Sequence, residues 1–425
     1  MIDPADAADA PQATPDEVAA YEFASPSIRF GEGRAAEIGD VVRRFGRSAW
    51  LVTGRRHESP AVRTVVAALD AAGVPVERIA SAGGEPTVAD VVTGLAAIAH
   101  RPLDAIVIVA VGGGSAIDLA KAVAALSTNG LEEIGSTAPA LEARLDSLVV
   151  DHLEGVGKGL PIRNEPLPVV AVPTTAGTGA EATRNAVISC PERRFKKSLR
   201  SPLLVPRVAV VDPLLSATCP RSVVAACGID CITQLIESYI CRFRRPLTRA
   251  IVRDALPRAI VSLPLAVRWA GETDVPPEAA RARAAMSHAA LCSGIALANS
   301  GLGLAHGVAA ALGIECGVSH GVACGLMLPV AMEVNLAVAV EDFAELERLV
   351  DPSCRVSAAE AAARFVRRIE EICGEAGIPR NLVEIGLTRD RIEWLAANSG
   401  GGSMRGNPVE LSTAQLAEVL AAHYD

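Results

Sequence analysis

Aromatic residues make up only 3% of this 425-residue sequence, and its formal net charge is −9. Proteins that bind nucleic acids need a basic surface for the phosphate backbone, and those that bind single strands add aromatic side chains for base stacking. The sequence has no dense tract of lysine or arginine to supply such a surface. These absences argue against a nucleic-acid partner.

The sequence also lacks long apolar stretches, a secretory signal and a disulfide framework. No window of about 18 to 20 apolar residues is free of charges, as a membrane span would require. Residues 1–22 are acidic and rich in alanine and proline, without the basic and apolar regions of a signal peptide. The ten cysteines are scattered from Cys190 to Cys373 and form no CxxC pair. We expect a cytoplasmic protein with reduced thiols, no membrane span and a flexible acidic tail over residues 1–24.

The length and composition are those of an enzyme-sized globular protein with two domains. The 425 residues exceed the usual size of a single core, and 50% of them are apolar. From residue 25 to 213, short β-branched runs alternate with longer amphipathic segments, as in βαβ units with a parallel sheet. After Pro213, helical periodicity continues to the C-terminus, broken at Pro264, Pro276, Pro329 and residues 400–402. We predict an α/β domain over residues 25–213 and an all-α domain over residues 214–425.

The pattern of the first domain assigns most of its elements. Strands are expected at Ser48–Thr53, Ala105–Val111, Val169–Val172 and Val208–Val211. Helices are expected between them, at Ala61–Ala72, Val88–His100 and Ser115–Leu126. Within residues 130–166 the pattern suggests an amphipathic helix around Leu141–Leu153, and it indicates no function for this segment.

A glycine turn, Gly112, Gly113 and Gly114, joins the second of these strands to the helix that begins at Ser115. Glycines let the backbone approach a pyrophosphate closely, and the N-terminus of a helix attracts anions. Ser115 and Asp118 also fit a capping box for this helix. The glycines could equally serve a tight turn alone, because the segment lacks the G-x-G-x-x-G fingerprint.

A second loop with small and hydroxyl residues follows the next strand, over Pro173–Glu181. Its hydroxyls can donate hydrogen bonds to phosphate and ribose oxygens, and its small side chains leave room for a flat ring. Such a loop is more often only a turn, but together with the glycine turn it could form one ligand site.

Candidate metal ligands lie in the helical half. Asp230 and Gln234 are four residues apart in a predicted helix, so their side chains share one face. His306 and His320 follow in later apolar segments. A carboxylate and two imidazoles suit Zn²⁺ or Fe²⁺. By spacing alone, histidines buried in a helical core remain the more common explanation.

These motifs together resemble the iron-containing (group III) alcohol dehydrogenase family. The similarity rests on Val111–Lys121 (VGGGSAIDLAK), Pro173–Ser189 (PTTAGTGAEATRNAVIS), Asp212-Pro213, His306-Gly307 and His320–Ala323. The motifs occur in the family's order and spacing, and the similarity extends from about Tyr21 to Pro408.

The resemblance implies a Rossmann-like dinucleotide-binding N-terminal domain, an all-α metal-binding C-terminal domain, and a cleft that holds both NAD(P) and the metal. It implies a catalytic metal, Fe²⁺ or Zn²⁺, on four ligands: Asp230, Gln234, His306 and His320. It assigns cofactor contacts to the first motif, with Gly112, Gly113, Gly114, Ser115 and Asp118. It assigns further contacts to Thr174, Thr175, Thr178 and Lys196.

The sequence departs from the family at two positions. The usual second ligand is histidine, and Gln234 offers only a neutral amide oxygen there. A further histidine, four residues after the third ligand, commonly helps to relay the proton, and here that position is Ala310. The first departure leaves open how tightly, and which, metal is bound, and the second leaves water and the cofactor ribose to carry the proton.

The activity implied is hydride transfer between a nicotinamide and a small alcohol or aldehyde, in a homo-oligomer such as relatives often form. One alternative is a metal-free reductase or a non-redox relative of the same fold group, which Gln234 keeps open. A second is a nucleotide-binding protein without catalysis, against which Asp230, His306 and His320 argue. The substrate, the physiological direction and the oligomeric state cannot be read from the sequence.

The end of an early strand, Gly54-Arg55-Arg56, bears on the choice of cofactor. Relatives that prefer NAD commonly have an aspartate where Gly54 stands. A carboxylate there binds the adenosine ribose and repels a 2′-phosphate, whereas glycine leaves space for that phosphate. Arg55 and Arg56 could then bind it, so we predict a preference for NADP(H), with a solvated basic turn as the alternative.

Overall fold

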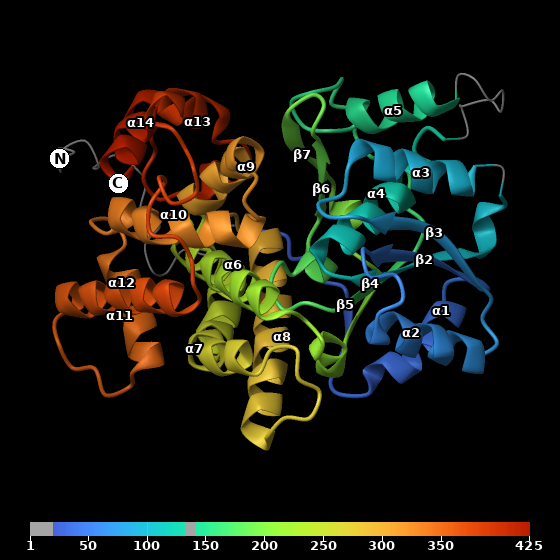
Figure 1. The fold of residues 1–425 in the computed structure, drawn as a ribbon, viewed down its shortest axis with the longest axis horizontal. Coiled ribbons are helices and arrows are strands. Elements are labelled where there is room, and N and C mark those ends of the chain that lie inside the picture. Colours follow the sequence, from blue (N-terminus) through green and yellow to red (C-terminus); the bar gives the residue numbers. More distant parts are fainter. Residues whose placement is uncertain (1–19, 100, 132–140) are drawn as a thin grey trace. The chain divides into compact units, whose positions relative to one another are not determined.

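The structure is a computed structural model that describes residues 20–99, 101–131 and 141–425. Contacts divide the chain into two units (Figure 1). The sheet unit comprises Ala24–Cys227 and Leu265–Ile295, and the helical unit comprises the segment ending at Phe23, Gly228–Pro264 and Ala296–Asp425. Most of the tail predicted over residues 1–24 lies outside the described residues, and so does His100 at the end of a predicted helix.

Six parallel strands form the main sheet of the sheet unit, in the order β1-β8-β5-β4-β2-β3. Their bounds are β1 (Ser27–Phe30), β2 (Ser48–Gly54), β3 (Val76–Ala82), β4 (Ile106–Gly112), β5 (Val169–Pro173) and β8 (Val208–Val211). The four predicted strands are all confirmed. The two that the sequence did not reveal, β1 and β3, lie at the edges of this sheet. Edge strands carry exposed polar residues, such as Glu77 and Arg78, that interrupt the apolar pattern.

Two further strands also escaped prediction. β6 (Asn185–Cys190) and β7 (Phe195–Arg200) pair antiparallel as a separate two-stranded sheet. In β6 every second residue is buried, but β7 carries three basic residues in six, so its sequence resembles a solvated loop.

Helices cover both faces of the main sheet, and two apolar cores result. α1 (Ile38–Arg43) and α2 (Pro60–Ala71) contribute to one core, and α3 (Val88–Ile98), α4 (Gly114–Thr128) and α5 (Leu141–Asp151) to the other. Alternate residues of β4 enter opposite cores, because successive side chains of a strand point to opposite faces. This explains why β4 is an uninterrupted apolar run in the sequence.

The carboxyl ends of three neighbouring strands lie in one row. Thr53 pairs with Val111, and Gly112 pairs with Pro173. The chain proceeds from β2 to β3 on one side and then returns to place β4 on the other side of β2. This reversal is the switch point at which open parallel sheets bind ligands, at the carboxyl ends of the strands.

The described part of the helical unit contains helices and no strands, in agreement with the all-α prediction. The helices that follow the sheet are α6 (Arg221–Ile240), α7 (Pro246–Arg268), α8 (Pro277–Asn299), α9 (Leu304–Cys316), α10 (His320–Asn335), α11 (Val340–Val350), α12 (Ala358–Glu375), α13 (Ile392–Asn398) and α14 (Thr413–Ala422). The chain passes between the two units within α6, α7 and α8. The domain boundary after Pro213 stays a prediction.

Two of the expected helix breaks are wrong, because α7 continues through Pro264 and α10 through Pro329. A proline inside a helix cannot donate to the carbonyl four residues earlier, which is Gly325 in the case of Pro329. The Cys373 thiol lies 3.7 Å from this carbonyl oxygen and donates to it instead. The positions of prolines in a sequence do not reveal such compensating side-chain contacts, so they do not predict where a helix continues.

One helix of the described chain, α6, is long and apolar enough to cross a membrane, and α8 and α9 pass the same test only when they are taken together. The α8–α9 pair is bent by 102°. In α6, 83% of the apolar window is buried inside the protein. Its apolar character therefore reflects a position in the protein core.

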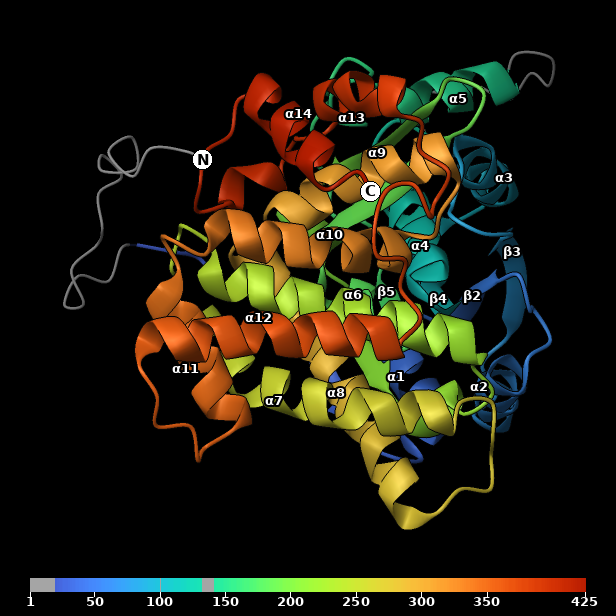
Figure 2. The same ribbon diagram turned by 60° about the vertical axis from the view of Figure 1, so that its left-hand side comes forward.

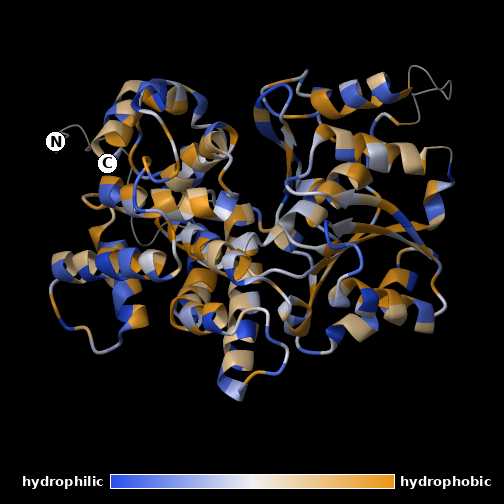
Figure 3. Cartoon of the chain, viewed as in Figure 1, coloured by the Kyte–Doolittle hydropathy of each residue, from blue (hydrophilic) through white to orange (hydrophobic). Residues whose placement is uncertain are grey.

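The helices α11 and α12 have both hydrophilic and hydrophobic residues. In Figure 3, α11 and α12 alternate between hydrophilic and hydrophobic segments along their length. Phe343 and Phe365 stack between these two helices with their ring centroids 6.2 Å apart. α12 also packs against α10, which packs in turn against α9 (Figure 2). These contacts support the two helices that carry His306 and His320.

A buried lysine anchors α4, the helix that follows the glycine turn. The Lys121 amine donates to Thr183 Oγ1 at 2.7 Å and to the Asn185 carbonyl at 2.9 Å. Asp118 lies 3.7 Å from the amine and accepts a hydrogen bond from the Val187 N–H at 3.0 Å. The predicted capping box of Ser115 and Asp118 is therefore wrong: α4 begins at Gly114, and Gly113 caps it without a side-chain hydrogen bond.

Burial has the largest effect on the pKa values of Lys121 and Glu181 in this network. It lowers the pKa of Lys121 to about 8, although Asp118 and Glu181 oppose the shift. It raises the pKa of Glu181 to about 7, and the charge of Lys121 only partly offsets this. Each charged form thus depends on its partners, because isolated buried charges are strongly disfavoured.

We predict that Lys121→Met destabilises the protein by about 3–5 kcal/mol, because it leaves the buried carboxylates of Asp118 and Glu181 without their cation. Unfolding by urea, followed by circular dichroism, measures the change. Lys197→Met, at an exposed position of β7, is the control and is expected to behave like wild type. Equal midpoints for the two variants would show that the amine does not hold α4 in place.

Candidate metal centre and cofactor loops

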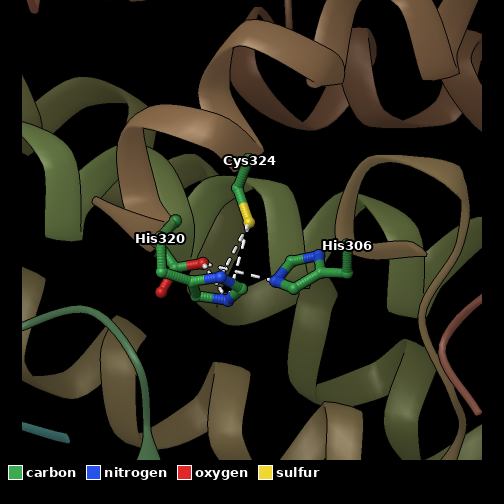
Figure 4. A group of neighbouring side chains, drawn as sticks. His306, His320 and Cys324 are labelled. Carbon is green, nitrogen blue, oxygen red and sulfur yellow. Dashed lines mark hydrogen bonds and ion pairs between the residues drawn. The ribbon is translucent and has the colours of Figure 1, made fainter. Parts of the chain in front are cut away.

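Three of the four predicted metal ligands converge in the helical unit. Asp230 comes from α6, His306 from the first turn of α9, and His320 is the first residue of α10. His306 Nε2 lies 3.3 Å and His320 Nε2 lies 3.9 Å from the same oxygen, Asp230 Oδ1. The imidazole centroids are 5.4 Å apart. Three helices that are distant in the sequence therefore direct ligand atoms to one point, and Figure 4 shows His306 and His320 in this group.

A fourth side chain joins this group, and the sequence analysis missed it. Cys324 lies one turn after His320 on α10, and its Sγ is 3.7 Å from His320 Nε2. The ligand atoms of Asp230, His306, His320 and Cys324 all lie within 4.8 Å of one another. The spacing of four residues between His320 and Cys324 was the available signal, because it places two ligand types on one helix face.

The group is buried except on one side. The side chains of Asp230 and His306 are only 2% and 4% exposed, whereas that of His320 is 33% exposed. Asp230 Oδ1 and His306 Nε2 make no hydrogen bond to any described residue. Buried polar atoms are normally hydrogen-bonded, so two such atoms facing each other have the chemistry to share a cation. The residues therefore fit a divalent metal, which His320 would leave accessible from solvent.

Glu237 holds His306 in place, and it too was missed from the sequence. Its Oε2 lies 2.6 Å from His306 Nδ1, and its Oε1 accepts a hydrogen bond from the Ala305 N–H at 2.7 Å. A carboxylate on Nδ1 leaves Nε2 free to bind a cation and raises its basicity. Glu237 lies two helical turns after Asp230 on α6, so the two carboxylates share one face.

Gln234, the fourth predicted ligand, lies between these two carboxylates along α6. The residue is 2% exposed, so it belongs to the interior of the helical unit. Its role as a ligand stays a prediction. Ala310, at the position of the family's additional histidine, lies in α9, where it offers no titratable atom.

Burial and neighbouring charges together set the protonation of the site. Burial alone would raise the pKa of Asp230, but the imidazoles of His320 and His306 bring this pKa below its ordinary value. Burial disfavours charged His306, yet Cys324, Asp230 and Glu237 raise its pKa well above the ordinary value. The pKa of the Cys324 thiol rises to about 12 because the thiol is buried. A bound cation displaces protons from such groups.

The two predicted cofactor loops meet in the sheet unit. The Thr174 N–H donates to the Gly112 carbonyl at 2.9 Å. A Cβ on Gly113 would lie 3.2 Å from Thr175 Oγ1, and a Cβ on Gly114 would lie 2.6 Å from Thr178 Oγ1. Only glycine fits at the second position, so the hydroxyls of one loop lie directly against the backbone of the other. These loops, at the switch point of the sheet, fit the pyrophosphate of a dinucleotide.

The remaining predicted cofactor residues lie around these loops. A Cβ on Gly112 would come within 3.1 Å of the Gly54 nitrogen, so the turn after β2 borders the glycine turn. Lys196 on β7 forms an ion pair with Glu85, and its side chain is almost fully buried. The Asp118 carboxylate is turned toward Val187 and Lys121, which gives it a structural role. The cofactor contacts of these residues stay predictions.

Comparison with known proteins places this arrangement in a family. Residues 25–213 match the family description "Iron-containing alcohol dehydrogenase", and residues 224–424 match "Fe-containing alcohol dehydrogenase family, C-terminal". The chain belongs to the iron-containing alcohol dehydrogenase family. The resemblance inferred from the sequence is confirmed.

Relatives within this family extend over nearly the whole chain. The NAD-dependent methanol dehydrogenase of Bacillus methanolicus is 30% identical over 380 residues, which cover 89% of this chain and 92% of that protein. Lactaldehyde reductase of Escherichia coli K12 is 30% identical over 394 residues, covering 92% and 96%. The crystal structure of a 1,3-propanediol oxidoreductase superposes with a TM-score of 0.82 at 28% identity, covering 96% and 100%.

This iron-containing alcohol dehydrogenase is therefore an NAD-linked oxidoreductase of alcohols and aldehydes. The family also implies a divalent metal, and the ligand group in the helical unit supplies a site of suitable chemistry.

We predict that Glu237→Gln lowers the affinity for the metal roughly 10- to 100-fold, because the neutral amide no longer orients and polarises His306. Competition between the protein and a chelator measures the affinity. Glu333→Gln is the matched control, since Glu333 is an exposed glutamate of α10 whose carboxylate pairs with His423. An unchanged affinity in Glu237→Gln would mean that Glu237 only supports the fold.

Proposed function

We propose that the protein interconverts small primary alcohols and aldehydes with NADP(H), at a metal held by Asp230, His306 and His320. The observation that carries this proposal is the convergence of these three side chains, from three helices, on one point where Asp230 and His306 are buried and His320 is partly exposed. When bound, the metal polarises the substrate oxygen, and the nicotinamide supplies or accepts the hydride.

The protein's own residues orient and shield this chemistry. Glu237 fixes the His306 ring through Nδ1, so Nε2 faces Asp230. Burial of Asp230 and His306 excludes water on their side of the site, which strengthens electrostatic interactions there. The partly exposed His320 marks the side from which substrate and solvent reach the site.

The path of the proton differs from the one common in the family. Ala310 replaces the additional histidine and cannot relay a proton. His306 Nδ1 is engaged by Glu237 and is not available for this task. Water on the side of His320 and the cofactor ribose are left to carry the proton of the alcohol oxygen.

The glycine turn and the threonine loop form the cofactor site of the proposal. Gly112, Gly113, Gly114 and Ser115 surround the pyrophosphate, and Thr174, Thr175 and Thr178 line the opposite side. The close approach of the two loops supports this assignment, because their hydroxyl and backbone groups face the same point at the switch point of the sheet.

We predict that His306→Ala abolishes both metal binding and turnover. Metal analysis of the purified protein and a nicotinamide absorbance assay with a small alcohol are the two measurements. His423→Ala, a half-buried histidine of the helical unit, is the control and retains both properties. Wild-type metal content in His306→Ala would refute the assignment of the metal site.

The preference for NADP(H) rests on the turn after β2. A Cβ on Gly54 would meet no atom within 4 Å, so this turn leaves open space. Arg55 and Arg56 follow it and are exposed. Each charge-assisted bond to a 2′-phosphate is worth roughly 1.5–3 kcal/mol, or about 10- to 100-fold in affinity.

We predict a ratio of kcat/KM for NADPH over NADH above one in the wild type. Gly54→Asp fits the open space and lowers this ratio about 10- to 100-fold, because the carboxylate repels the 2′-phosphate. Gly374→Asp introduces the same charge at an exposed, open position of α12 and should leave the ratio unchanged. A wild-type ratio below one, or one that Gly54→Asp does not alter, would defeat the prediction.

A further inference from the structure

The metal group contains a sulfur atom that the proposed function does not use. Cys324 is buried, and its Sγ lies 3.7 Å from His320 Nε2 and 4.0 Å from His320 Nδ1. Figure 4 shows the thiol of Cys324 and the ring nitrogens of His306 and His320 pointing toward one another. The cysteine is thus directed into the metal group.

The three ligands of the proposed function leave a coordination position to fill. Asp230, His306 and His320 supply one oxygen and two nitrogens. Of the remaining buried candidates, Gln234 offers a neutral amide oxygen, and Cys324 offers sulfur that becomes an anionic thiolate. The thiolate is the far stronger ligand for zinc.

The spacing of the donor atoms agrees with a tetrahedral ion. With Zn–N and Zn–O bonds of about 2.0 Å and a Zn–S bond of about 2.3 Å, neighbouring donors lie about 3.3 Å apart, or about 3.5 Å when one is sulfur. The His306 Nε2–Asp230 Oδ1 distance is 3.3 Å, and the Cys324 Sγ–His320 Nε2 distance is 3.7 Å. The widest separation in the group is within 4.8 Å, so modest side-chain rotations would bring all four donors to an ion.

We propose that Cys324 is the fourth protein ligand of the metal and that the site selects Zn²⁺ over Fe²⁺. This inference rests on the proposed function, because it concerns the same metal. As the sulfur–metal bond forms, the thiol proton passes to solvent, and the thiolate remains on the ion. Gln234 then lies outside the coordination sphere, and the substrate oxygen would be added as a fifth ligand.

Two spectroscopic measurements on the purified full-length protein test the ligand directly. X-ray absorption at the zinc edge of the zinc-loaded protein is expected to show one sulfur at about 2.3 Å beside nitrogen and oxygen at about 2.0 Å. Replacement of zinc by Co²⁺ is expected to produce a sulfur-to-cobalt charge-transfer band in the near ultraviolet. Neither readout depends on turnover.

Three variants assign the sulfur and the selectivity. Cys324→Ser is expected to lose both signals and to reduce the preference for Zn²⁺ over Fe²⁺, in competition binding, roughly 10- to 100-fold. Cys316→Ser, a half-buried cysteine at the end of α9, is the matched control and keeps both signals. Gln234→Ala also keeps the sulfur signal, because sulfur and not the amide holds the ion.

The outcomes separate this inference from the proposed function. Metal bound by nitrogen and oxygen alone in an active wild-type enzyme overturns the thiolate ligand and leaves the proposed function standing. Loss of bound metal in Gln234→Ala with no sulfur signal in the wild type identifies Gln234 as the fourth ligand instead. A wild-type protein that binds neither Zn²⁺ nor Fe²⁺ overturns both. Because the wild-type spectra decide these cases, failure of Cys324→Ser to fold does not rescue the inference.

Discussion

The hydrogen bond between Glu237 and His306 is the interaction on which the arrangement of the helical unit depends. One carboxylate oxygen orients the imidazole, and the other caps the start of α9 through the Ala305 N–H. A buried carboxylate needs such partners, because desolvation without hydrogen bonds is strongly unfavourable. The same contact therefore fixes the angle at which α9 meets α6 and the atom that His306 presents to Asp230. One interaction therefore sets both the position of α9 and the chemistry of the site.

In the sheet unit, the cofactor loops are arranged by close approach of backbone segments and not by a side-chain hydrogen bond. The carboxyl ends of β2, β4 and β5 lie in register, so the loops that follow them meet without any long side chain. Thr178 lies where a side chain on Gly114 would be. This leaves peptide groups and small hydroxyls at the surface of the two cofactor loops. Such a surface suits phosphate, whose charge is spread over several oxygens. The helical unit presents single, strongly directed donors, which suit a small cation.

Much of the fold could be read from the sequence, because the buried parallel strands are uninterrupted β-branched runs. The edge strand β3 could not, since Glu77 and Arg78 face solvent and hide the pattern. The same distinction holds at the metal group. Asp230, His306 and His320 were recognisable by residue type and family spacing. Glu237 and Cys324 share a helix face with Asp230 and His320, but helical spacing within one element does not specify which neighbour that face meets.

Because the ligands come from α6, α9 and α10, a bound metal also restricts the chain as a polymer. An ion held by Asp230, His306 and His320 ties together segments that are far apart in the sequence, much as a covalent cross-link does. Closing long loops of this kind removes conformational freedom from the unfolded chain, and a ligand that binds only the folded state shifts the equilibrium toward it. The metal would therefore belong to the folding of the helical unit as much as to its chemistry, so that loss of the ion and loss of the fold would be linked.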